Sequence, residues 1–106
     1  MSTELDLLSV LKDRETYLSF SRFVDSASLS DLAQVLVKSL GSYFEAKDTV
    51  ETVDWGQFRT WFMVIKHPSM KAERKQLFNK LFDRLESHEA DPAFQEELLG
   101  HFIVRS

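Results

Sequence analysis

The chain contains no cysteine and only three glycines among its 106 residues. Without cysteine there is no disulfide framework and no thiolate for zinc binding or nucleophilic catalysis, which fits a reducing compartment. The glycines, at positions 41, 56 and 100, form neither a phosphate-binding glycine-rich loop nor a dinucleotide fingerprint. We therefore expect these residues neither to bind nor to hydrolyse ATP.

No apolar run in the chain is long enough to cross a membrane as a helix. The longest, Trp61 to Ile65, has five residues, whereas a spanning helix needs about 20. Near the N-terminus, Glu4 and Asp6 stand where a signal peptide would carry basic residues. These features predict a soluble, cytoplasmic protein.

Hydrophobic residues make up 43% of the chain and charged residues 28%, a balance typical of a globular protein and not of a disordered one. A length of 106 residues is close to the commonest size of a domain. We find no repeat, low-complexity tract or interdomain linker in the sequence. Residues 1–106 are therefore expected to form a single helical domain.

Apolar residues recur at spacings of three and four along most of the chain, which is the pattern of amphipathic helices. The clearest stripe runs from Leu29 to Phe44. Residues 47–53 are rich in threonine and valine, but a lone strand would have no partner, so we expect an extended loop. The stripes predict an all-α fold, a compact bundle of about six helices at residues 3–12, 13–24, 29–44, 54–67, 69–85 and from 91 onward.

Short polar side chains stand where several of these helices begin, and such residues cap the free N–H groups of a first turn. We expect N-caps at Asp13, Asp54, Ser69 and Asp91. Pro68 disfavours helix at the preceding residue and should end the fourth segment.

Two further features concern packing. Gly41 lies inside the third segment, where it either permits close packing or weakens the last turn.

The fifth segment should bury a single apolar face made of Met70, Leu77, Phe78, Leu81, Phe82 and Leu85.

Catalytic and metal-binding patterns are missing. The histidines, at positions 67, 88 and 101, have no metal-ligand spacing on one helix face. His88 lies near Glu89 and Asp91, but a solvated polar loop explains this grouping better than a metal site. No serine lies in a nucleophile-elbow or triad pattern. We therefore assign no catalytic, cofactor-binding or metal-binding residue, and expect no enzymatic activity from this chain.

Charge is distributed unevenly along the sequence. Residues 1–58 carry a net charge of −5, residues 59–84 of +5 and residues 85–106 of −4. A helical wheel of the fifth segment spreads its basic residues around an apolar face, which argues against direct DNA binding and favours contact with an acidic face of another copy or another protein. The candidate basic face comprises Lys71, Arg74, Lys75, Lys80 and Arg84.

The run Trp61-Phe62-Met63-Val64-Ile65 is the best candidate for a functional surface. Five consecutive apolar residues cover every side of a helix, so some must point away from a single core. Either the helix is central and surrounded, or part of the run is exposed and binds another chain. A second apolar group lies near the C-terminus. The candidate interface residues are Trp61, Met63, Val64, Phe102 and Ile103.

Four stretches together resemble the N-terminal domain of DnaB-like replicative DNA helicases of the bacteriophage type. They are Leu-Leu-x-Val-Leu-Lys-Asp-Arg-Glu-x-Tyr at 7–17, Ser-Tyr-Phe at 42–44, Val-Asp-Trp at 53–55 and Gly-His-Phe-Ile-Val-Arg at 100–105. The resemblance covers nearly the whole chain as scattered residues and helices, without one diagnostic motif.

This resemblance implies a helical collar domain that precedes an ATP-driven motor. Such domains pair with each other on a hexamer and offer a docking surface for primase or a helicase loader, in a bacterial or phage-infected cell. The chain has neither the Walker A lysine nor any other motor residue, so ATPase activity and unwinding are not assigned to it. Residues 101–105 would then lead towards the linker, and the last predicted helix indeed lacks a C-terminal cap.

Two alternatives remain open. One is a free-standing phage or bacterial adaptor or regulator that binds proteins through its helices. The other is a helix-turn-helix DNA-binding protein, with its turn at His67-Pro68-Ser69 and a basic fifth helix. The expected partners are a second copy of the chain, as a homodimer or higher oligomer, and a primase or loader, with weak or no binding of nucleic acid and no membrane.

Overall fold

The computed structural model describes residues 3–24, 29–88 and 97. Within them lie five α-helices: α1 Thr3–Leu11, α2 Arg14–Phe20, α3 Asp31–Ala46, α4 Trp55–Trp61 and α5 Ala72–Ser87. A 3₁₀ turn, η1 Ser21–Phe23, follows α2, and a π-helical turn, η3 Phe62–Lys66, extends α4. This part of the chain contains no β-strand, which confirms the all-α prediction. Of the sixth predicted helix, from residue 91 onward, only residue 97 is described, and it is helical.

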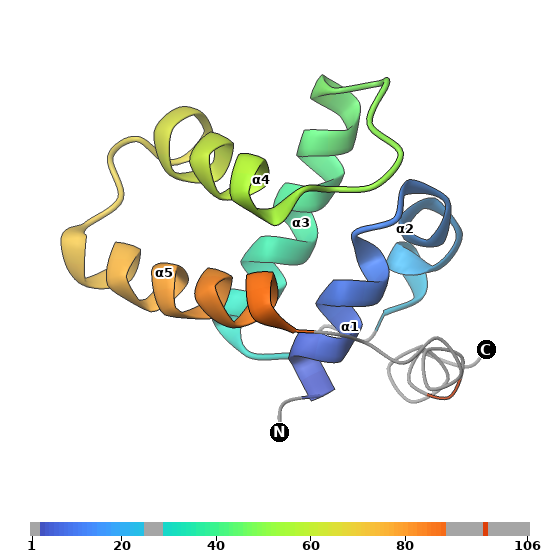
Figure 1. Cartoon of the computed structure of the whole chain (residues 1–106), viewed down its shortest axis with the longest axis horizontal. Coiled ribbons are helices and arrows are strands. Elements are labelled where there is room, and N and C mark those ends of the chain that lie inside the picture. The colour runs from blue at the N-terminus through green and yellow to red at the C-terminus, as the bar shows by residue number, and fades with distance from the viewer. Residues whose placement is uncertain (1–2, 25–28, 89–96, 98–106) are drawn as a thin grey trace.

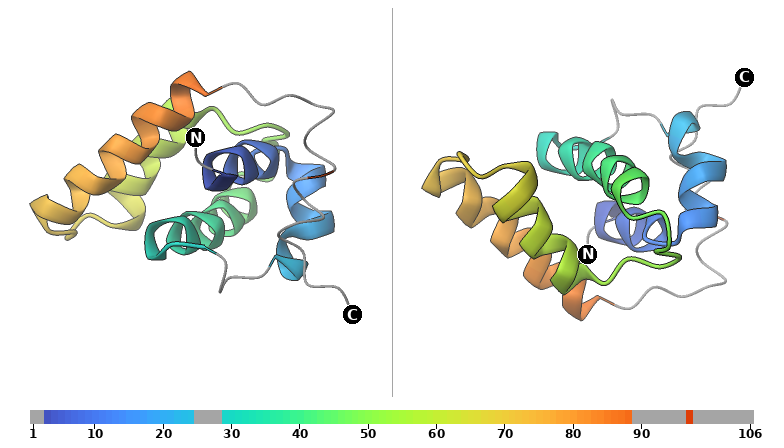
Figure 2. Two further views of the ribbon diagram at one scale, coloured as in Figure 1. Left: turned by 90° about the horizontal axis from the view of Figure 1, so that it is seen from below. Right: turned by 90° about the horizontal axis from the view of Figure 1, so that it is seen from above.

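The helices are arranged around α1, which packs against α2, α3 and α5. Figure 1 shows α1 and α3 running in the same direction, with α2 on one side of the pair. On the other side, α4 and α5 run antiparallel as a hairpin, and both views of Figure 2 show them adjacent. None of the described helices is both long and apolar enough to cross a membrane.

The helices share one apolar core, to which α1 and the α4–α5 hairpin contribute fully buried side chains. Leu7, Leu8 and Leu11 of α1 are completely buried. Rings from α4, η3 and α5 form an aromatic cluster, with neighbouring ring centroids 4.8 to 6.0 Å apart; its members are Phe58, Phe62, Phe78 and Phe82. Because all four rings are fully buried, the α4–α5 hairpin is held by apolar packing.

Local capping fixes the start of three helices. The carboxylates of Asp13 and Asp54 accept backbone N–H groups in the first turns of α2 and α4, as predicted. The hydroxyl of Ser30 does the same for α3. Each bond satisfies a donor that has no partner within its own helix.

The predicted cap at Ser69 is wrong. Helix α5 begins at Ala72, and Lys71 occupies its N-cap without a side-chain capping bond. A backbone turn explains the delay, because the N–H of Met70 donates to the carbonyl of His67 over 3.3 Å. The chain is thus still turning at the position where the cap was expected.

The predicted apolar face of α5 is also too wide, because Leu77 is 51% exposed. Phe78, Phe82 and Leu85 are buried, whereas Met70 and Leu81 are half-buried. The helix packs mainly against α1 and α4. Since successive residues are about 100° apart around a helix, Leu77 lies at the edge of the buried stripe.

Gly41 allows a close approach between α2 and α3. A Cβ atom at this position would lie 2.5 Å from the hydroxyl oxygen of Tyr17. That hydroxyl donates a hydrogen bond of 2.8 Å to the carbonyl of Val37. The close-packing interpretation of Gly41 is therefore confirmed, and helix α3 continues past it to Ala46.

The predicted loop between α3 and α4 is present but not extended throughout, because the N–H of Val50 donates to the carbonyl of Lys47 over 3.1 Å in a turn. Arg14 holds this loop in place. The guanidinium donates to the carbonyls of Phe44 at 3.0 Å, Lys47 at 2.5 Å and Val50 at 2.6 Å. An isolated antiparallel bridge between Asp13 and Thr52 adds backbone pairing. One side chain of α2 thus satisfies carbonyls both at the end of α3 and in the loop.

Candidate functional site: an apolar groove beside α4

The apolar run Trp61–Ile65 does not continue as an ordinary α-helix. The N–H of His67 donates to the carbonyl of Phe62 over 2.9 Å, which is an i to i+5 bond. Such π turns in helices occur frequently at functional sites. Phe62, the first residue of η3, is fully buried in the aromatic cluster, and high exposure begins only at Val64.

The structure separates the members of this run. Trp61 is half-buried, with its ring 5.1 Å from that of Tyr43 and 5.9 Å from that of Phe58, measured between centroids. Met63 is also half-buried. Val64 and Ile65 are 64% and 66% exposed, more than any other large apolar side chain of the described residues. The run therefore contributes side chains both to the core and to the surface.

A groove of about 430 Å³ lies beside these exposed residues. Tyr43, Trp61, Val64 and Ile65 supply its apolar lining. The remaining lining residues are polar or small, with Lys47 as the one charged side chain among them; they are Lys47, Gly56, Gln57 and Thr60. We call this surface the aromatic groove. An apolar hollow rimmed by polar groups is the anatomy of a protein-binding surface.

The basic residues of the candidate face are found in two places. Lys71 and Arg74 line a hollow at the start of α5. Lys80 and Arg84 line a different hollow, together with Glu4 of α1. Lys75 is half-buried. The five residues therefore do not form one continuous strip.

Arg59, outside the candidate face, is bound within the α4–α5 hairpin. It pairs with Asp83 at 2.8 Å and Glu86 at 3.5 Å, and its Nε donates to Asn79 at 3.1 Å. Its guanidinium also lies 5.9 Å from the ring centroid of Phe82. Arg59 therefore ties α4 to α5 and is engaged within the domain.

His88 has a structural partner. Its Nε2 lies within hydrogen-bonding distance of the carboxylate of Asp6, and both side chains are largely buried. The contact joins α1 to the residue that follows α5. In the part of the chain that the structure describes, no group of three histidine, aspartate or glutamate side chains could hold a metal ion. Two of the candidate interface residues, Phe102 and Ile103, lie outside the described residues.

Sequence reasoning did not select three surface features. Ile65 belonged to the apolar run but was not chosen as an interface residue, and Tyr43 was assigned only to the stripe of its helix. Leu77 was placed in the core. A signal for Leu77 was present, because Glu73 and Lys80, its neighbours four residues before and three after on the same helix face, are both charged.

The chain matches none of the family models, curated proteins or solved structures with which it was compared. Its function is therefore inferred from its own residues.

Proposed function

We propose that this chain is a non-catalytic protein-interaction domain that associates with a second copy of itself through the aromatic groove. The observation that carries the proposal is the exposure of Val64 and Ile65 directly beside the groove. Burying apolar surface releases about 25 cal/mol for each Å² removed from water. A half-buried tryptophan among aliphatic residues also has the composition of an interface centre.

Charge complementarity favours a second copy as the occupant. The N-terminal 58 residues have a net charge of −5, whereas residues 59–84 have a net charge of +5. In a twofold dimer each copy uses the same surface, so the basic segment of one copy can approach the acidic segment of the other twice. Attraction of this kind contributes mainly to orientation and to the rate of association.

A narrower form of the proposal follows the resemblance to DnaB-like helicases. In that form the domain is the N-terminal collar of a hexameric replicative helicase, where it pairs with its neighbours and docks a primase or loader. The support is the scattered residue pattern together with the all-helical fold. The test is the source gene beyond codon 106: an in-frame Walker A motif is expected, and an immediate stop codon would contradict this form.

Self-association is tested with the double variant Val64→Asp and Ile65→Asp. Both side chains are mostly exposed, so the variant should melt like the wild-type chain. It should sediment as a monomer at concentrations where the wild type is an oligomer, because two carboxylates would be placed in an apolar contact.

The matched control is Leu18→Asp, because Leu18 is an apolar residue of α2 with 62% exposure that does not line the groove. This control should keep the wild-type oligomeric mass. If the wild type is monomeric throughout, or if the control dissociates as readily as the double variant, the aromatic groove is not the self-association surface.

A further inference from the structure

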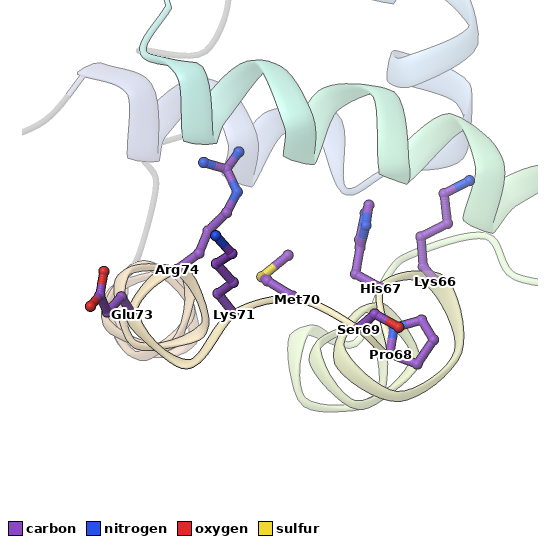
Figure 3. Close-up of a pocket in the computed structure, with 8 residues that line it drawn as sticks. All are labelled: Lys66, His67, Pro68, Ser69, Met70, Lys71, Glu73 and Arg74. Atoms are coloured by element: carbon purple, nitrogen blue, oxygen red, sulfur yellow. The ribbon is translucent and has the colours of Figure 1, made fainter.

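A second hollow lies where η3 meets α5, separate from the aromatic groove. It has a volume of about 470 Å³ and is lined by residues 66–71, 73 and 74. We call it the basic cup, after Lys66, His67, Lys71 and Arg74. In Figure 3 these four side chains extend to one side of the backbone, whereas Glu73 projects away from them. The only carboxylate of the lining is therefore turned away from the cations.

The cations of the basic cup are not neutralised. In the described part of the chain, Lys66, Lys71 and Arg74 take part in no ion pair. Arg74 instead lies with its guanidinium carbon 5.3 Å from the ring centroid of Phe78. This contact leaves the N–H groups of Arg74 available for an anion, because a stacked guanidinium donates from its edge.

The position of the cup on α5 adds to the positive potential. Lys71 and Arg74 stand at the N-terminus of the helix, where the backbone dipole is itself positive and basic side chains are unfavourable. The first turn also has no side-chain cap, unlike the first turns of α2, α3 and α4. An anion in the cup would relieve the repulsion and supply acceptors for the N–H groups.

His67 lines the cup but packs inward, with its ring centroid 4.6 Å from that of Phe62. Its Nε2 atom is buried and has no hydrogen-bond partner among the described residues. Burial lowers the pKa of His67 below its ordinary value of 6.5, and the charges of Lys66 and Arg74 lower this pKa further. Because this atom is inaccessible from outside, an anion in the cup would contact the exposed cations and not the Nε2 of His67.

We propose that the basic cup binds a phosphate monoester carried by a small ligand. Arg74 would donate paired N–H groups to the phosphate oxygens, with Lys71 as a point charge beside it, whereas Lys66 lies beyond His67 at the other end of the cup (Figure 3). The arrangement suits one compact anion. A duplex backbone would need a longer basic strip, and Lys80 and Arg84 lie in the other hollow with Glu4.

The test is an NMR titration of the chain with inorganic phosphate and then with a mononucleotide, against sodium chloride at equal ionic strength. Saturating shifts are expected at the His67 ring and at the first-turn amides of α5 with both phosphate compounds. Arg74→Gln should weaken binding by about tenfold or more, because a charged hydrogen bond is lost. Lys71→Gln, which removes a charge without removing the contact with Phe78, should also weaken it.

Arg84→Gln is the matched control, since Arg84 is an exposed arginine on the same helix but outside the cup. It should bind phosphate like the wild type. If sodium chloride causes equal chemical-shift changes, or if Arg84→Gln loses as much phosphate affinity as Arg74→Gln, the effect is general screening of charge and the proposal is overturned. Tighter binding of duplex DNA than of the mononucleotide, falling steeply with salt, would replace it by a nucleic-acid surface.

Discussion

Tyr17 and Gly41 show how one residue sets the distance between two helices. The ring of Tyr17 lies against α3 where that helix has no side chain, and its hydroxyl bonds to a carbonyl of the same helix. The ring centroid is also 5.3 Å from that of Phe44. The glycine is therefore required by its neighbour and not by its own backbone, since no described glycine has a positive φ angle.

Gly41→Ala should destabilise the fold by about 1–3 kcal/mol, even though alanine is the better helix former. The new methyl group would lie 2.5 Å from the Tyr17 hydroxyl and force it away from the carbonyl of Val37. Urea denaturation measures the loss. In a Tyr17→Phe background the loss should be smaller, because the nearest ring atom is then 3.3 Å away. An equal loss of stability in both backgrounds would show that the contact with the Tyr17 hydroxyl does not cause the destabilisation.

The hydroxyl of Tyr17 should also make the free energy of unfolding change with pH in the alkaline range. Burial raises the pKa of Tyr17 above 10.0, against the opposing effect of hydrogen bonds with Ser21 and Gly41. The folded chain holds this proton more tightly than the unfolded chain. The raised pKa therefore contributes fully to the free energy of unfolding below about pH 10, and this contribution is lost as the pH rises through the raised pKa. Unfolding free energies measured from about pH 9 to about pH 11 should fall more steeply for the wild type than for Tyr17→Phe. Parallel profiles would contradict this assignment.

At the scale of elements, Arg14 organises a loop that has little regular structure. Arg14→Lys should destabilise the fold by about 1–3 kcal/mol, because lysine cannot reach three carbonyls with one planar group. Thermal melts measure the effect. The neighbouring Glu15→Gln serves as the control, since Glu15 is exposed, and should melt like the wild type. A lysine variant of wild-type stability would mean that the loop does not depend on these bonds.

The starts of α2 and α4 could be predicted because a cap depends on residues next to each other in sequence. The caps at Asp13 and Asp54 are of this kind. The failure at Ser69 has a different origin, since the backbone turn between His67 and Met70 uses the same stretch of chain. The π turn of η3 could likewise not be predicted from the sequence, because periodicity alone does not reveal a shift from i+4 to i+5 hydrogen bonding.

At the scale of the whole molecule, the contact between Asp6 and His88 links α1 to the residue that follows α5. His88→Ala should lower the free energy of unfolding by about 1–3 kcal/mol, because it leaves the buried carboxylate of Asp6 without this partner. Chemical denaturation measures the loss. Ser87→Ala is the control, since the hydroxyl of Ser87 bonds only to carbonyls of its own helix. Equal stability of the two variants would contradict the role given to His88.

The candidate site could be predicted only in part. The apolar run at Trp61 marked the right region, because five successive apolar residues cannot all face one core. Which of them are exposed depends on how α4 and η3 pack against Tyr43 and the rings of α5. That Lys66 and Arg74 line one hollow depends equally on the turn between η3 and α5. Such relations arise only when the helices are assembled.

Self-association through the aromatic groove is tested most directly by isotope-filtered NMR on a mixture of ¹³C-labelled and unlabelled chains. Methyl groups of labelled Val64 and Ile65 should show intermolecular cross-peaks to aromatic protons of the unlabelled copy, including those of Trp61. These peaks should disappear on dilution. A protein that stays monomeric at high concentration, or intermolecular peaks confined to another surface such as that around Leu18, would contradict the proposed dimer.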